Sequence, residues 1–99
     1  MTLYHVTPSR NIASILKDGL IPQVGKYAKE MGEDTPAVFL FPCMEDAQEM
    51  KAVWLEPFYG NDLVSLEVTL PNDFPLEYTG SDYEVVSLRP IPAGAIRRV

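Results

Sequence analysis

Residues 3–20 read LYHVTPSRNIASILKDGL, and this stretch decides how the rest of the chain is interpreted. Residues 2–6, TLYHV, include β-branched, aromatic and apolar side chains, which predicts a strand. Thr7 is then expected to cap a helix that has Pro8 at its first position, where the missing N–H costs nothing. Gly19 is expected to end that helix. The predicted buried stripe of the helix consists of Ile12, Ile15 and Leu16.

The remainder of the chain predicts short elements separated by proline and glycine. Residues 23–36 are polar without a sustained period, which indicates a loop. Residues 45–55 have an acidic start and apolar residues at three-to-four spacing, which predicts an amphipathic helix. The expected buried positions of that helix are Ala47, Met50, Val53 and Trp54. Further strands are predicted at residues 37–41, 63–70, 83–88 and 95–99. The expected fold class is therefore α+β, with mainly strands.

Length and composition predict one domain over residues 1–99. The net charge of −6 opposes binding of nucleic acid through phosphate neutralisation, although Arg89, Arg97 and Arg98 gather near the C-terminus. A solvated strand edge is the better explanation for those arginines, and a local basic patch is the alternative. The sequence holds a single cysteine, Cys43, and lacks a long apolar run, so we expect a cytoplasmic protein without a membrane segment.

Few residues of this chain can carry chemistry. With one histidine and one cysteine, a metal centre is hard to build, and we expect none. Neither Ser9 nor Cys43 lies in a strand-turn-helix elbow of a nucleophile, and no glycine-rich phosphate loop follows a strand. His5 in the first strand is either a structural hydrogen-bonding group or a site residue. Glu84 opens an apolar strand and points either to solvent or into a site.

The sequence around these residues resembles the catalytic domain of ADP-ribosyltransferases of the diphtheria toxin and poly-ADP-ribose polymerase type. Residues 3–20 are similar to the first motif of that family, with its strand histidine, a hydroxyl two residues later and a closing Gly-Leu. Residues 37–41 resemble the second motif, where Phe39 stands in place of the family's tyrosine. Glu84 and the three residues after it resemble the third motif, a strand that a glutamate opens. The resemblance implies a small fold of two packed, mainly antiparallel sheets with two or three helices.

The resemblance also implies roles for these residues. Glu84 and His5 would be catalytic: Glu84 binds a ribose hydroxyl of NAD and stabilises an oxocarbenium-like transition state, as carboxylates do in glycoside hydrolysis. His5, the backbone of Val6, and Thr7 would hold the dinucleotide, and Phe39 would pack on nicotinamide. Further candidates for contacting nicotinamide are Tyr27 and Tyr59. The expected substrate is NAD, and the expected acceptor is a protein in the host cell, as for a toxin or a phage-borne anti-defence effector.

Other interpretations stay open. Val6 replaces the family's glycine after the histidine, and Phe39 replaces the tyrosine, so the chain could instead be an inactive binding module. Such a module would inhibit a defence or nucleic-acid-handling complex through its acidic surface. Chemistry like that of RNA 2′-phosphotransferases is a third interpretation, which the negative charge opposes. Asp82 is either a turn residue or a group that positions the acceptor.

Overall fold

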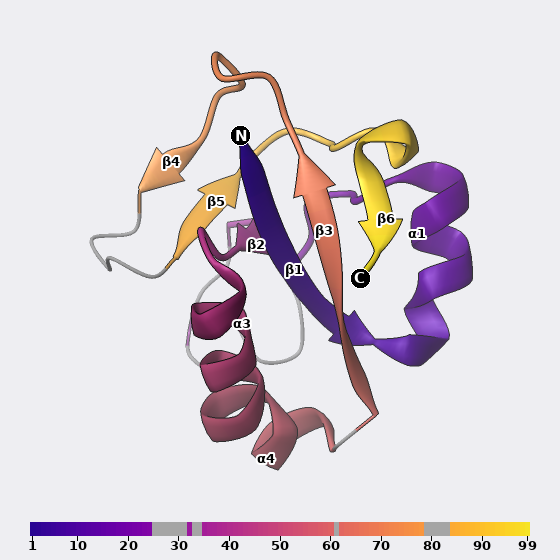
Figure 1. Ribbon diagram of the computed structural model, residues 1–99, viewed down its shortest axis with the longest axis vertical. Helices are drawn as coiled ribbons and strands as arrows, with labels where there is room; N and C mark the ends of the chain where they lie inside the picture. Colours follow the sequence, from indigo (N-terminus) through magenta and orange to yellow (C-terminus); the bar gives the residue numbers. More distant parts are fainter. Residues whose placement is uncertain (25–31, 33–34, 61, 79–83) are drawn as a thin grey trace.

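A computed structural model describes residues 1–24, 32, 35–60, 62–78 and 84–99. It consists of two small antiparallel sheets and two helical regions (Figure 1). This architecture confirms the predicted α+β class with two mainly antiparallel sheets. The helical regions are α1 (Ile12–Asp18), preceded by the 3₁₀ turn η1 (Ser9–Asn11), and a run made of α3 (Met44–Met50), the π-helix η2 (Lys51–Leu55) and α4 (Glu56–Tyr59).

The first sheet has the strand order β1–β3–β6. Its strands are β1 (Thr2–Pro8), β3 (Leu63–Thr69) and β6 (Ile96–Arg98), with the 3₁₀ turn η3 (Ala93–Ala95) before β6. β1 pairs with β3 along its whole length, whereas β6 pairs only with Leu66–Val68. We call this the long sheet.

The second sheet has the order β2–β5–β4, and we call it the short sheet. It consists of β2 (Val38–Leu40), β5 (Val85–Ser87) and β4 (Glu77–Tyr78). An isolated bridge between Tyr4 and Phe41 joins β1 to the end of β2, with N–H to carbonyl distances of 2.9 and 2.8 Å. The strands therefore follow one another across both sheets in the order β6, β3, β1, β2, β5, β4.

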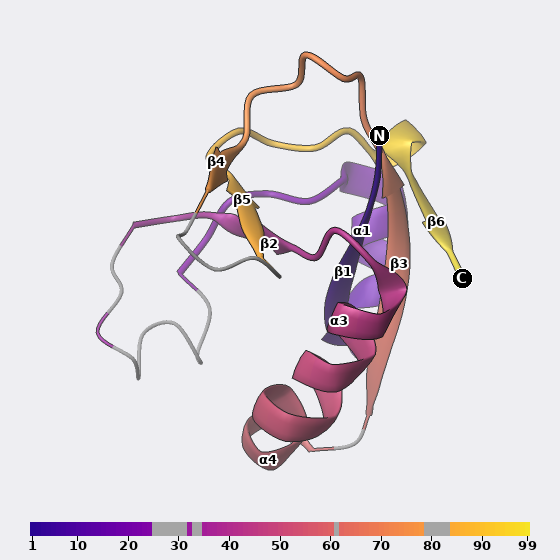
Figure 2. The same cartoon turned by 60° about the vertical axis from the view of Figure 1, so that its left-hand side comes forward.

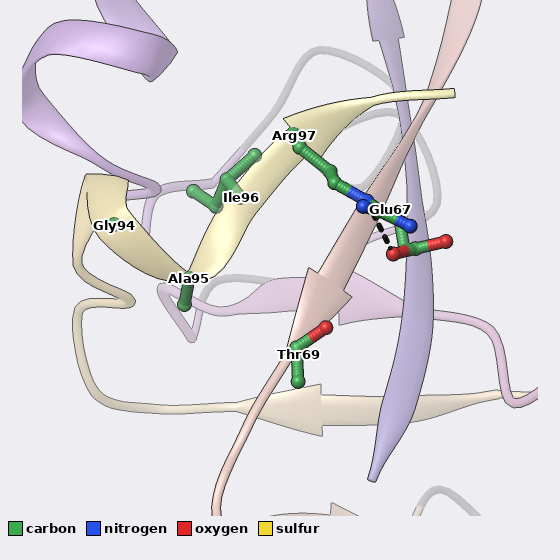
Figure 3. Close-up of a pocket in the computed structure, with 6 residues that line it drawn as sticks. All are labelled: Glu67, Thr69, Gly94, Ala95, Ile96 and Arg97. Atoms are coloured by element: carbon green, nitrogen blue, oxygen red, sulfur yellow. Dashed lines mark hydrogen bonds and ion pairs between the residues drawn. The ribbon is translucent and has the colours of Figure 1, made fainter.

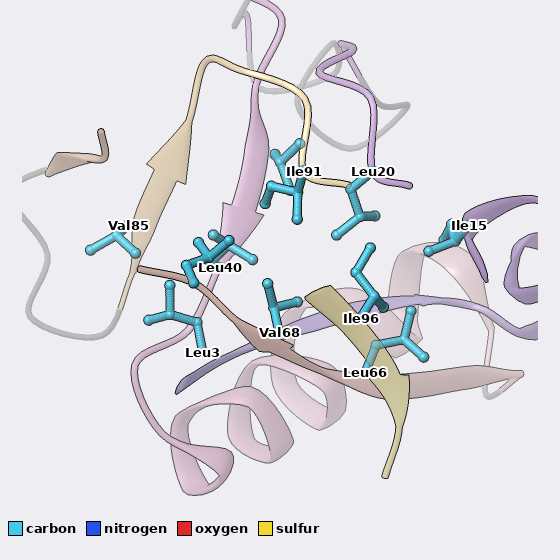
Figure 4. Close-up of a cluster of buried hydrophobic side chains, with 11 residues drawn as sticks. Leu3, Ile15, Leu20, Leu40, Leu66, Val68, Val85, Ile91 and Ile96 are labelled. Carbon is cyan, nitrogen blue, oxygen red and sulfur yellow. The ribbon is translucent and has the colours of Figure 1, made fainter. Parts of the chain in front are cut away.

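The hydrophobic core lies between the two sheets (Figures 2 and 4). Leu66, Val68 and Ile96 face it from the long sheet, and Leu40 and Val85 face it from the short sheet. The alternation of apolar and polar residues over 63–70 predicts a buried face made of Val64, Leu66, Val68 and Leu70. The last three are buried as predicted, whereas Val64 is only partly buried. Burial of one face of each sheet accounts for the fold.

Several predicted boundaries were wrong. Thr7 does not cap a helix and Pro8 is not its first residue, because both belong to β1, where they pair with Val64 and Leu63 of β3. Ser9 N–H extends that pairing by donating to the carbonyl of Asp62 at 3.0 Å. The backbone groups of this segment thus find partners in a second strand, and this tertiary pairing delays the helix to Ile12.

Two residues expected in buried helical stripes are exposed, Leu16 at 39% and Val53 at 56%. Ile12, Ile15 and Ala47 are buried as predicted, whereas Met50 is only partly buried. The side chain of Trp54 lies outside the described part of the structure. The helix predicted to end at Leu55 instead continues to Tyr59, passing through a π turn that no periodicity signalled. β4 was not predicted from the sequence, because two residues are too few to show alternation.

Candidate functional site

The candidate site is built around β2, which lies between the strand that carries His5 and the strand that Glu84 precedes. β1 meets β2 at the Tyr4–Phe41 bridge, and β2 pairs with β5 so that Leu40 is opposite Val85. Continuing that register by one residue places Glu84 opposite Phe41. The three sequence motifs, at His5, Phe39 and Glu84, therefore come from three neighbouring strands, although 79 residues separate the first from the last in the sequence.

His5 is fixed to β2 by its side chain. Its Nδ1 lies 2.8 Å from the backbone carbonyl oxygen of Phe39. Because a carbonyl oxygen can only accept a hydrogen bond, Nδ1 carries the proton and donates it. In the neutral ring Nε2 is then left as an acceptor. The contact thus sets the ring orientation and its tautomer together.

The protein environment keeps this imidazole neutral. Burial lowers the pKa of His5 below its ordinary value of 6.5, because desolvation penalises the charged form, while the hydrogen bond to Phe39 acts in the opposite direction. Desolvation is the larger of the two effects. At neutral pH, His5 therefore offers an acceptor nitrogen and not a positive charge.

Thr7 lies two residues further along β1, on the same face as His5, since strand side chains alternate. It is only 4% exposed, and its Oγ1 accepts a hydrogen bond from Asn11 Nδ2 at 3.3 Å. With that lone pair engaged, the hydroxyl proton of Thr7 is free to be donated elsewhere. Asn11 lies within the motif of residues 3–20, and its contact with Thr7 depends on the 3₁₀ turn that follows β1.

The remaining site residues are placed as follows. Val6 is partly buried and pairs with Ser65 of β3. Phe39 is partly buried in β2 and opposite Val86. Glu84 is partly buried and immediately precedes β5. Tyr27 and Asp82 lie outside the described residues, and Tyr59 ends α4 with its side chain outside them.

Metal-binding groups and membrane-spanning helices were both sought in the part of the chain that the structure describes. No group of three or more histidine, cysteine or carboxylate side chains there is arranged to hold a metal ion. Within the same residues, no helix is long and apolar enough to cross a bilayer.

The comparisons with known proteins give no family for this chain. No family model matches its sequence, and no curated protein is significantly similar to it.

Proposed function

We propose that the protein is an NAD-dependent mono-ADP-ribosyltransferase that modifies a protein acceptor, with Glu84 and His5 as its catalytic residues. The observation that carries this proposal is the order of the strands β1, β2 and β5. This order brings the segments that carry the histidine, aromatic and glutamate motifs onto neighbouring strands, which supports the proposal.

The spacing of the strands suits a nucleoside. β1 and β5 are separated by β2, so their backbones are about two strand spacings, roughly 10 Å, apart near the Tyr4–Phe41 bridge. The proposal places the ribose attached to nicotinamide within this span, with His5 toward one end and Glu84 toward the other.

The hydrogen-bonding character of His5 also supports a ribose ligand. Its neutral Nε2 accepts a hydrogen bond, which a sugar hydroxyl can donate and a phosphate oxygen cannot. This favours an unmodified ribose hydroxyl over a phosphate at that position, and so counts against the phosphate-bearing RNA substrate of a 2′-phosphotransferase. The net charge of −6 acts in the same direction and opposes a nucleic-acid acceptor.

In the proposed reaction, the bond between nicotinamide and the ribose breaks as an acceptor side chain attacks the anomeric carbon. Glu84 stabilises the positive charge that develops on the sugar and orients the ribose hydroxyl. His5 holds the dinucleotide, and the ring of Phe39 offers an apolar face to nicotinamide. Nicotinamide leaves, and the acceptor loses a proton as it gains ADP-ribose.

An inactive binding module is the second candidate, and one observation favours it. Thr7 is 4% exposed and already hydrogen-bonded to Asn11, as expected of a residue that has a structural role and touches no ligand. Wild-type protein that neither binds NAD in calorimetry nor releases nicotinamide would support this candidate.

The decisive substitution is Glu84→Gln, with Glu77→Gln as its control. The amide keeps the shape of Glu84 and removes its charge, so we expect NAD binding to persist and nicotinamide release to fall by about 10²- to 10³-fold. Glu77 is exposed on the neighbouring strand β4 and has the same charge, so its substitution should leave the rate near that of the wild type. Mass spectrometry of released nicotinamide provides the measurement. Equal rates for the two variants would remove Glu84 from the mechanism.

A further inference from the structure

A pocket of about 250 Å³ lies where β6 ends beside β3. β1 pairs with all of β3, whereas β6 covers only Leu66–Val68, so β3 runs on beyond the end of β6 (Figure 2). Within the described part of the chain, Leu63–Ser65 therefore has no strand partner on that edge. The pocket is lined by this stretch, by α1 and by the α3–η2 helix.

Two positive charges meet at this pocket without a carboxylate side chain. Lys51 and Arg98 both line it, and no aspartate or glutamate does. Across the described residues, neither cation takes part in an ion pair or a side-chain hydrogen bond. Other cations of the described residues also lack an ion pair; what distinguishes Lys51 and Arg98 is that both line one pocket.

The neighbouring Arg97 shows the contrast. It lines a different hollow at the edge of β6, and its Nε lies 2.6 Å from Glu67 Oε1 on β3 (Figure 3). Its charge is thus partnered within the protein, whereas the charges of Lys51 and Arg98 are available to a ligand.

A buried hydroxyl at the same pocket also lacks a partner. Ser65 lines the pocket, and its Oγ is buried without a hydrogen bond in the described structure. A buried polar atom left unpaired costs free energy, and such atoms are uncommon enough to require an explanation. An acceptor atom of a ligand would satisfy this hydroxyl.

The helix that carries Lys51 is irregular at this residue. Lys51 begins the π-helix η2, directly after the regular turns of α3. Such wide turns occur often at functional sites, because they change the direction of the side chains they carry. The irregular turn, the unpaired cations and the unpaired hydroxyl come from separate segments of the chain and meet at one pocket.

We propose that this pocket binds an oxyanion carried on a small apolar group, such as an aryl or alkyl carboxylate or phosphate monoester. Lys51 and Arg98 pair with the anion, and the Ser65 hydroxyl donates to one of its oxygens. Ile12, Met44 and Val64, which also line the pocket, contact the apolar part of the ligand. This site is independent of the proposed reaction at Glu84.

The test is an NMR titration of the ¹⁵N-labelled protein with phenyl phosphate, benzoate, inorganic phosphate and, as the neutral control, benzyl alcohol. We expect saturable shifts at the amides of Leu63–Leu66 with the first two compounds and weaker binding of the other two. Whichever of phenyl phosphate and benzoate binds more tightly identifies the preferred anion as phosphate or carboxylate. Shifts that never saturate with either compound, or equal binding of benzyl alcohol, overturn the proposal.

Variants separate the site from general attraction of anions. Lys51→Gln and Arg98→Gln should each weaken binding by about tenfold, since each removes a charge-assisted hydrogen bond. Arg97→Gln makes the same change in net charge at the neighbouring residue and should alter binding by less than about twofold. Equal loss in all three variants would mean that only the overall charge matters, and would contradict the site.

Ser65→Ala distinguishes a ligand-binding role of this hydroxyl from a purely structural one. Removing an unpaired buried hydroxyl should leave the thermal midpoint unchanged or raised, while ligand binding weakens. Val99, the last residue of the sequence, also lines the pocket, and its terminal carboxylate would compete with an anionic ligand. The titration is therefore repeated on protein extended by two glycines. Binding that stays equal or becomes tighter supports the proposal, and binding abolished in the extended protein overturns it.

Discussion

The two sheets bury the same core, but they are built differently. The long sheet pairs seven residues of β1 with seven of β3, whereas the strands of the short sheet have three, three and two residues. The short sheet therefore depends on contacts outside its own ladders, namely the Tyr4–Phe41 bridge, the Gln23–Ala37 bridge and the His5–Phe39 hydrogen bond. The candidate site lies at the junction of the two sheets. Its β1 side is therefore held by a longer ladder of backbone pairs than its β2 and β5 side.

The largest expected effect comes from truncating one buried leucine in each sheet. Leu66 and Leu40 are both fully buried, at 0% exposure, and each faces the core. Leu→Ala substitutions in cores cost about 2–5 kcal/mol, and the cost depends on how far the site can collapse. We expect Leu66→Ala to lie near the upper end of that range and Leu40→Ala near the lower end, because the short sheet can relax into the cavity. Urea denaturation measures both, and a larger loss for Leu40→Ala would contradict the comparison.

A pair of glycines tests the connection from α1 to the segment after β5. Gly19 and Gly60 both follow a helix with positive φ, 85° and 83°. A Cβ on Gly19 would lie 2.2 Å from the carbonyl oxygen of Ile91, whereas one on Gly60 would have nothing within 4 Å. Gly60→Ala should cost about 1–3 kcal/mol from backbone strain alone, because φ 83° with ψ −178° is a conformation essentially limited to glycine. Gly19→Ala should cost at least about 1 kcal/mol more, since it also disrupts the Leu20–Ile91 bridge. Thermal unfolding of both variants gives the difference, and equal losses would show that the contact with Ile91 yields easily.

The smallest expected effect concerns the hydrogen bond that links the sheets through His5. The pKa of His5 in the folded protein is below the value of 6.5 expected for the unfolded chain. Between these two values the unfolded state binds more protons, so stability falls as the pH drops below about 6.5 and is unaffected by His5 above about 7. Each unit of pKa lowering is worth at most about 1.4 kcal/mol.

His5→Gln provides the control for this effect, because it does not titrate. We expect the wild type to lose more stability than His5→Gln between pH 7 and pH 5, while carboxylates titrate alike in both proteins. Denaturation at both pH values measures the difference. Parallel curves for the two proteins would place the folded-state pKa of His5 at its ordinary value.

The sequence by itself determined the elements with strong local patterns. The alternation over residues 63–70 identified β3 and its buried face, the apolar run at residues 37–41 identified β2, and Gly19 marked the end of α1. These features depend on periodicity and on glycine's access to positive φ, and both properties are local. The candidate residues His5, Phe39 and Glu84 were also chosen from the sequence.

Only the tertiary structure decided the features that depend on a distant partner. Thr7 and Pro8 joined β1 because β3 supplied a strand to pair with, although the local signals for a helix start are present. The tautomer of His5 follows from a carbonyl 34 residues away, and the unpaired cations at Lys51 and Arg98 meet only because β6 ends beside β3. Pairing partners, burial and charge neighbours come from chain segments that one local pattern cannot contain, and this is why the sequence could not give them.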